Sequence, residues 1–208
     1  LRVSTPLVGI ETPDQGATIA LLVRAANGDR PCLRFDLSGG LRGLNDLGRG
    51  EAEEIAKEAG MEKPEQLTNA GEMLALALRL QPKTILFIAN APYLFDNPVC
   101  VQAIDNLRDQ YKSNKRCLVL LGGILKLPPE IQNDVVLFEE EYPGEAELRE
   151  ILLSVYAPSA EKYGWATLME KEESNAIDAL RGLPAFLAEQ IAAMSLDKEL
   201  GLDLDSLW

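Results

Sequence analysis

Short apolar runs alternate with longer amphipathic segments along the chain. Five of these runs have the length of buried strands: 6–11, 31–37, 84–89, 117–121 and 135–138. The segments between them repeat apolar residues at intervals of three or four positions, which is typical of helices. The alternation predicts an α/β domain with a five-stranded, mainly parallel sheet.

Start and stop signals support the predicted helices. Thr12 is expected to cap the first helix, with Pro13 in its first turn, Gln15 completing a capping box and Gly28 ending it. Further helices are predicted within 49–60, within 69–80, and from Asn97 and Pro98 to about residue 111.

Beyond the segment 139–156 the pattern changes to helices alone. Residues 172–183 and 183–196 predict a helical hairpin that is broken between Gly182 and Pro184. We place a boundary near residue 157, which gives an α/β domain over 1–157 and a small all-helical domain over 158–208. Because the chain starts at Leu1 and stops abruptly, we expect it to be a piece of a longer protein.

Composition and charge narrow the classes of partner. With 47% hydrophobic residues among 208, the chain can bury a full core. The formal net charge of −13 repels nucleic acid and anionic membranes. The one dense basic stretch, Lys112–Arg116, is expected to be a solvated helix end. No run approaches the length of a membrane span and no signal peptide is recognised, so we expect a cytoplasmic protein without nucleic-acid or membrane partners.

The absence of histidine and the spacing of the cysteines narrow the catalytic and metal sites that the chain could contain. The chain contains no histidine, which rules out histidine-based catalysis and argues against a zinc site. Its three cysteines, Cys32, Cys100 and Cys117, lie in apolar runs without CxxC spacing. They are interpreted as small core residues in a reducing compartment.

The first strand lacks a phosphate-binding loop after it, although parallel sheets bind ligands at the carboxyl ends of their strands. Such a loop needs flexible glycines and a Lys-Ser/Thr pair at the start of the following helix. Here only Thr12 separates Glu11 from Pro13, and no GxxxxGK[ST] motif occurs. Glu11 and Asp14 would also repel phosphate.

The third strand ends on Ala89 and Asn90, where nucleotide hydrolases carry an acid that binds magnesium. An amide keeps the shape of aspartate but loses the charge that holds the metal and the basicity that activates water. Asn90 is therefore either the replacement of a lost acid or the cap of a turn that leads to Pro92.

Two other segments invite a binding site. The segment 38–43, with Gly39, Gly40 and Arg42, is either a loop that holds an anion or an ordinary connection. The acidic run Glu139–Glu141 is interpreted as a solvated strand end, because adjacent strand residues point to opposite faces. No catalytic residue and no metal site is expected.

The order of these parts resembles an AAA-type ATPase module with a helical lid. The segments that carry the resemblance are "ILFIAN", "CLVLLGGILKLPPEI", "VVLFEEEYPGEAELREIL" and "IDALRGLPAFLAEQIA". Together they resemble the plastid and cyanobacterial AAA family of uncharacterised reading frames, whose N-terminal half looks like a degenerate module that precedes an active one. The resemblance covers nearly the whole chain and implies the strand order 5-1-4-3-2.

Carried over residue by residue, the resemblance implies a nucleotide site without its chemistry. Its vestigial positions are Thr12 in place of the phosphate loop, Asn90 in place of the magnesium acid, Gly122 or Gly123 in place of the sensor asparagine, and Arg181 in the lid. Arg149 matches the arginine that leads into the lid. No arginine lies between Arg116 and Arg149, where the interfacial arginine finger would be.

The resulting hypothesis is a catalytically degenerate AAA-type module. It would bind no cofactor and act as a structural or assembly partner of an active ATPase module, in the same chain or another. One alternative is an ATPase that binds ATP and magnesium at an unconventional site built from 38–43 and Arg108. The other is a plain protein-binding module, and a homo-oligomer is left open.

The apolar tail has two interpretations. Leu200, Leu202, Leu204, Leu207 and Trp208 carry more apolar surface than a solvated terminus normally does. These residues either form an interface, with Trp208 as a large contributor, or complete the core of the lid.

Overall fold

The computed structural model describes residues 5–207, and the chain forms two compact units. We call the first, Leu1–Glu140, the α/β unit and the second, Glu141–Trp208, the helical unit. The boundary expected near residue 157 falls inside one helix, α6 (Glu145–Tyr163), which carries Pro158 within it. Proline removes a backbone hydrogen bond, but here the helix continues past it. The whole of α6 therefore belongs to the helical unit.

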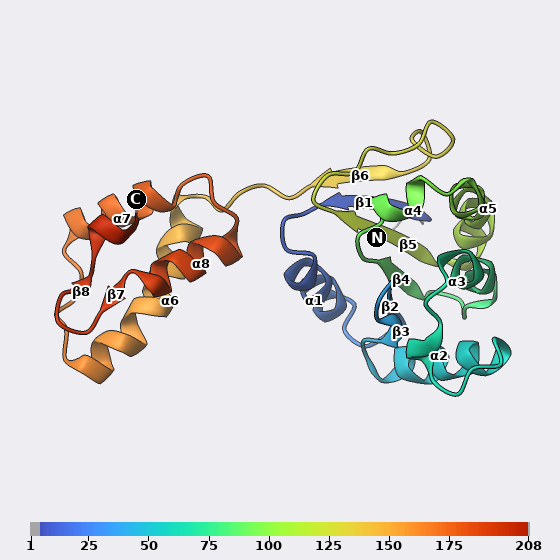
Figure 1. The fold of residues 1–208 in the computed structure, drawn as a ribbon, viewed down its shortest axis with the longest axis horizontal. Coiled ribbons are helices and arrows are strands. Elements are labelled where there is room, and N and C mark those ends of the chain that lie inside the picture. The colour runs from blue at the N-terminus through green and yellow to red at the C-terminus, as the bar shows by residue number, and fades with distance from the viewer. Residues whose placement is uncertain (1–4, 208) are drawn as a thin grey trace. The chain divides into compact units, whose positions relative to one another are not determined.

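Six strands form the sheet of the α/β unit, in the order β3-β2-β4-β5-β1-β6 (Figure 1). Their bounds are β1 (Leu7–Glu11), β2 (Cys32–Asp36), β3 (Gly40–Gly43), β4 (Ile85–Ile88), β5 (Cys117–Gly122) and β6 (Val136–Glu139). Without β3, this is the order 5-1-4-3-2, and those five strands are all parallel to their neighbours. The mainly parallel α/β fold is confirmed, with six strands instead of five.

The additional strand, β3, lies within 38–43, which the sequence predicts to be a connection. It pairs antiparallel with β2 and forms a hairpin at one edge of the sheet. The Asp36 carboxylate closes the turn, because it accepts hydrogen bonds from the N–H groups of Ser38 and Gly39 at 3.2 and 2.6 Å. Gly40, with a φ of 65°, adopts the left-handed conformation that starts the return strand.

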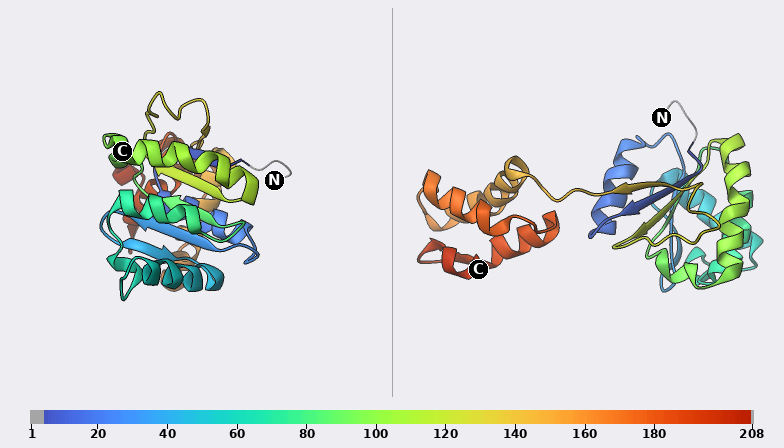
Figure 2. Two further views of the ribbon diagram at one scale, coloured as in Figure 1. Left: turned by 90° about the vertical axis from the view of Figure 1, so that its right-hand side faces the viewer. Right: turned by 90° about the horizontal axis from the view of Figure 1, so that it is seen from above.

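Helices cover the two faces of the sheet unequally (Figure 2). Within the α/β unit, α1 (Gln15–Ala25) packs on one face, whereas α2 (Asp46–Glu58), α3 (Ala70–Leu76) and α5 (Pro98–Asn114) pack on the other. Three short helices complete the connections: η1 (Pro64–Gln66), η2 (Ala77–Arg79) and α4 (Pro92–Phe95). The predicted start of α5 is confirmed, since the Asn97 side chain accepts a hydrogen bond from the Val99 N–H.

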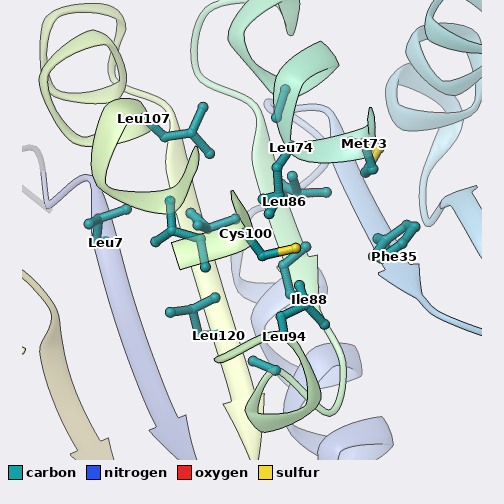
Figure 3. Close-up of a cluster of buried hydrophobic side chains, with 14 of the residues drawn as sticks. Leu7, Phe35, Met73, Leu74, Leu86, Ile88, Leu94, Cys100, Leu107 and Leu120 are labelled. Carbon is teal, nitrogen blue, oxygen red and sulfur yellow. The ribbon is translucent and has the colours of Figure 1, made fainter. Parts of the chain in front are cut away.

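The larger hydrophobic cluster lies between the sheet and α2, α3 and α5 (Figure 3). Leu86, Ile88 and Leu120 project from the strands toward Leu74 and Leu107 on the helices, and all five are at most 1% exposed. Each such side chain stabilises the fold by about 1.5–3 kcal/mol relative to an exposed position. The smaller cluster on the opposite face is formed beneath α1.

The cysteines belong to these cores. All three are free thiols, with Cys32 and Cys100 buried and Cys117 half-buried. Burial raises the pKa of each thiol, to about 11 for Cys117. The interpretation of the cysteines as core residues is confirmed.

The basic stretch Lys112–Arg116 is a solvated helix end only in part. Its lysines are exposed where α5 ends, as expected. Arg116 is buried, and its guanidinium donates to the carbonyl oxygens of Leu78 and Gln81 at 3.0 and 3.2 Å. The expectation is wrong for Arg116 because backbone acceptors satisfy its charge inside the fold.

The helical unit contains a small hairpin in addition to its helices. Its elements are α6, α7 (Glu170–Leu180), α8 (Ala185–Met194), β7 (Leu196–Asp197), β8 (Gly201–Leu202) and η3 (Leu204–Leu207). The break between residues 182 and 184 is confirmed by the ends of α7 and α8. The all-helical expectation is wrong for β7 and β8, which pair antiparallel over two residues each.

The apolar tail contributes to the core of the helical unit. Leu207 is 7% exposed, and Leu202 and Leu204 pack against the same buried cluster. Leu200 is 76% exposed. Trp208 lies outside the described residues, so the interface expected for it stays a prediction. Within residues 5–207, every helix is too short or too polar to span a lipid bilayer.

Candidate functional site

β1 runs almost directly into α1 at the carboxyl end of the sheet. Thr12 extends the pairing with β5, since its N–H donates to the Gly122 carbonyl at 2.9 Å. Asp14, not Thr12, caps α1 by accepting a hydrogen bond from the Ala17 N–H at 3.0 Å. The Thr12 hydroxyl instead lies 2.8 Å from the Thr18 hydroxyl. The connection is therefore too short to wrap around a phosphate group.

Asn90, the position matched to the magnesium acid, is bound to the first residue of α1. Its side-chain oxygen accepts a hydrogen bond from Nε2 of Gln15, and its N–H donates to Oε1 of Gln15, both at 2.8 Å. Gln15 therefore does not complete the capping box that the sequence predicts. The Asn90 carbonyl accepts a hydrogen bond from the Tyr93 N–H at 3.1 Å, so Asn90 also starts the turn into α4.

The backbone at Asn90 suits an asparagine. Its φ is 53°, in the left-handed region that asparagine and aspartate enter more readily than other side chains. The residue thus combines an uncommon backbone conformation with two hydrogen bonds to a helix that starts 75 positions earlier in the chain.

Gly122 lies where no larger side chain fits. A Cβ at this position would be 2.9 Å from both Cδ and Cγ of Pro92 and 3.2 Å from a methyl group of Leu125. By contrast, a Cβ at Gly123 would have nothing within 4 Å. The end of β5 therefore approaches the start of α4 too closely to carry a sensor asparagine at Gly122.

Several carboxylates lie near the carboxyl end of the sheet. Glu11 accepts a hydrogen bond from the Leu125 N–H at 2.6 Å, and Glu140 accepts one from the Thr18 hydroxyl at 2.9 Å. Among the described residues, no Lys or Arg forms an ion pair with Glu11, Asp14 or Glu140. An incoming polyphosphate would meet uncompensated negative charge.

Two surface cavities of the α/β unit lie elsewhere. One of about 270 Å³ is lined by residues of α3, α4 and α5, and one of about 410 Å³ lies beside α1 and β2. Neither is lined by Thr12, Asn90 or Gly122.

In the glycine-containing turn within 38–43, backbone N–H groups donate to a carboxylate of the same chain. The Asp36 carboxylate accepts the hydrogen bonds from Ser38 and Gly39, and Arg34 lies 3.5 Å from it. Burial alone would raise the pKa of Asp36, but these hydrogen bonds and the charge of Arg34 outweigh it, so that the pKa is lowered. An internal carboxylate thus occupies the position proposed for an external anion.

Arg42 and Arg108 are not brought together. Arg42 lies on β3, at one edge of the sheet, and its Nε donates to the Gly39 carbonyl at 3.2 Å. Arg108 lies on α5 and pairs with Asp134 at 2.7 Å, close to β6 at the opposite edge. It also pairs with two aspartates of α5. The parts of the unconventional nucleotide site therefore do not form one site.

The two arginines matched to the lid are paired within the helical unit. Arg149 lies 2.6 Å from Glu173. Arg181 lies 2.9 Å from Glu145 and 3.3 Å from Asp178. Both guanidinium groups are about half exposed, so these pairs contribute at most about 1 kcal/mol each.

Gln15 is the residue of this site that the sequence interpretation missed. Its position in the first turn of α1 matched a helix-capping signal, which concealed its long-range partner. The expected strand order could have indicated this contact. Because β1 and β4 flank β5, residues that follow these two strands meet across the end of β5.

Comparison with known proteins adds one finding. Residues 1–140 match the model of the N-terminal domain of SpoVK-like AAA ATPases. No curated protein sequence matches the chain. The matched range coincides with the α/β unit, and it covers 140 of the 208 residues. The chain therefore belongs to the SpoVK-like AAA ATPases, whose N-terminal domain its α/β unit forms.

Proposed function

We propose that this chain is a catalytically degenerate AAA-type module and acts as a structural or assembly partner of an active ATPase module. The active module would belong to the same chain or to another. The observation that carries the proposal is the pair of hydrogen bonds between Gln15 and Asn90. In an active site, the residue at the Asn90 position must be free to serve the metal and the attacking water.

Physical chemistry supports the loss of hydrolysis. Phosphoryl transfer depends on backbone N–H groups and a lysine around the phosphates, and on a metal that neutralises developing charge. The Thr12–Gly122 hydrogen bond closes the connection that would form the phosphate loop. Glu11 and Asp14 stand nearby without basic partners among the described residues.

Retention of the fold supports an assembly role. The mainly parallel sheet keeps a dense core, which a module that serves assembly requires. Large apolar side chains remain exposed near the carboxyl end of the sheet, namely Tyr93, Val99 and Ile124, at 71%, 66% and 67%. Exposed apolar side chains of this size suit contacts between modules. From the sequence segments that carry the resemblance, we also infer that the relationship extends to the plastid and cyanobacterial AAA family.

The chain is expected to bind ATP with magnesium no more tightly than a Kd of about 1 mM, equivalent to about −4 kcal/mol. The reason is the absence of the phosphate loop, its lysine and the metal-binding acid. Isothermal calorimetry of the chain of 208 residues measures this directly. A micromolar Kd would overturn the proposal and favour the nucleotide-binding alternative.

Asn90→Asp is expected to produce no ATP hydrolysis. The new carboxylate can still accept the hydrogen bond from Gln15, and the missing phosphate loop is a separate defect. A phosphate-release assay with and without magnesium measures turnover. Measurable turnover would show that the matching of the first strand, and with it the position of the phosphate site, is wrong.

The assembly role is tested in the parent protein. Where the same reading frame encodes an AAA module with a GxxxxGK[ST] loop, deletion of residues 1–208 is expected to reduce the size of the assembled particles in light scattering. Asn90→Asp in the intact protein is the matched control and should leave particle size unchanged. A reading frame without such a module, together with no association with any AAA ATPase, would favour the plain protein-binding module.

A further inference from the structure

The two edge strands of the sheet, β3 and β6, differ in what packs against them. At β3, a Cβ on Gly40 would lie 2.2 Å from the carbonyl oxygen of Glu65 in η1, and a Cβ on Gly43 would lie 2.3 Å from the N of Arg49 in α2. The backbone of these two helices therefore packs directly against β3, the strand at that edge.

The opposite edge, β6, carries three exposed apolar side chains. Val136, Leu137 and Phe138 are 45%, 47% and 55% exposed. In the part of the chain that the structure describes, β6 pairs only with β1. Natural edge strands are usually protected by a charge, a proline or a bulge within the strand. β6 is short, at four residues, and carries one charge, Glu139, at its end, but Val136–Phe138 have neither a charge nor a proline.

The backbone of β6 has groups available for another strand. The backbone N–H of Glu140 donates to the Glu11 carbonyl at 2.9 Å, so the backbone groups of Glu140 point toward β1. Because backbone groups alternate in direction along a parallel strand, the N–H and C=O groups of Val136 and Phe138 also point toward β1. The N–H and C=O groups of Leu137 and Glu139 therefore point outward, away from β1.

Charge indicates what kind of segment would fit. Glu139 and Glu140 are both exposed at the end of β6. The whole chain carries a net charge of −13, so a second copy would bring further negative charge to this edge. A segment with basic residues beside these glutamates would instead be attracted.

We propose that the β6 edge binds an extended, basic segment of a partner protein by strand addition. Alternate apolar side chains of that segment would cover Val136, Leu137 and Phe138, and its Lys or Arg residues would lie beside Glu139 and Glu140. Antiparallel addition, with the basic residues at the N-terminal end of the segment, gives the more stable ladder. This inference is independent of nucleotide binding and stands or falls separately from it.

The test uses the chain of 208 residues and a synthetic heptapeptide, two lysines followed by alternating threonine and valine. Amide exchange followed by NMR is expected to slow at least about tenfold at Leu137 and Glu139 when the peptide is saturating. Exchange at Val136 and Phe138, whose N–H groups already face β1, should change little. A peptide of the same sequence with N-methylated backbone positions on its pairing edge should give no protection.

Charge reversal provides the matched pair of variants. Glu139→Lys with Glu140→Lys is expected to weaken binding of the lysine peptide about tenfold and to strengthen binding of a peptide with two glutamates in place of the lysines. Glu53→Lys with Glu62→Lys changes the net charge equally at exposed positions of the α/β unit outside β6. This control should bind the lysine peptide nearly as the unmodified chain does.

Three outcomes would overturn the proposal. The first is equal binding, or no binding, of the lysine and glutamate peptides. The second is peptide binding without protection at Leu137 and Glu139. The third is protection of these two amides that rises with chain concentration alone, together with dimers in light scattering, because a second copy would then occupy the edge.

Discussion

Glu51→Ala is expected to lower the free energy of unfolding of the α/β unit by about 3 kcal/mol, because buried donors lose their acceptor. Glu51 lies on α2 and is 2% exposed. One carboxylate oxygen accepts the N–H of Gln81, and the other accepts the Thr84 hydroxyl at 2.7 Å. The buried Arg116, which stands near this carboxylate, would lose its compensating charge. Glu51 thus joins α2 to the start of β4.

Glu51→Gln is the matched control, since its side-chain oxygen can still accept from Gln81 and its amide can donate to Thr84. Burial raises the pKa of Glu51, against the opposing effects of these hydrogen bonds and Arg116. The folded state therefore holds this proton more tightly than the unfolded state. The stability that this titration contributes is complete below the ordinary glutamate pKa and is lost as pH rises through the raised one.

Two measurements check these expectations. Chemical denaturation followed by circular dichroism gives the free energy, and amide exchange of Leu86 and Ile88 reports on the α/β unit in particular. As pH rises above the ordinary glutamate pKa, the stability of Glu51→Gln should improve relative to the unmodified chain, because the variant lacks this titration. An alanine variant as stable as the glutamine variant would show that the hydrogen bonds accepted by Glu51 do not stabilise the α/β unit.

Gly122→Asn, which restores the sensor asparagine of the resembled modules, is expected to destabilise the α/β unit by about 1–3 kcal/mol through overpacking. The new Cβ would lie 2.9 Å from the ring atoms of Pro92, and the buried amide would need polar partners. Either α4 or the end of β5 must move to admit it.

Gly123→Asn is the control for this substitution. It introduces the same side chain one position later, where nothing lies within 4 Å of the new Cβ and the residue is exposed. Its effect on stability should stay within about 0.5 kcal/mol. Equal loss of stability in both variants would show that asparagine itself, and not the approach of Pro92, is unfavourable at the end of β5. Neither variant is expected to bind ATP.

Local signals predicted much of the α/β unit. Asn97 and Pro98 begin α5 as predicted, because a cap and a first-turn proline act within a few residues of the helix start. The break between α7 and α8 follows from Gly182 and Pro184 for the same reason. At the start of α1 the sequence predicts Thr12 as the cap, but Asp14 caps the helix, because the Thr12 N–H extends the pairing with β5.

Long-range partners could not be predicted in this way. Arg116 was expected to be part of a solvated basic stretch. It is buried because its guanidinium donates to carbonyl groups more than 30 positions earlier in the chain. The segment 38–43 looked like an open loop, and the Asp36 carboxylate turns it into a hairpin. Pro158 looked like a boundary, although α6 continues through it.

By itself, the sequence determined the α/β class, the order of the five parallel strands through its resemblance to AAA modules, and the absence of a phosphate loop after Glu11. These properties depend on apolar periodicity and on motifs that are continuous in the chain. Only the tertiary structure decided that Gln15 binds Asn90, that Gly122 lies against Pro92 and that, within residues 5–207, β6 pairs with β1 alone. Each of these contacts joins residues that only the folded sheet brings together, so no local pattern could encode it.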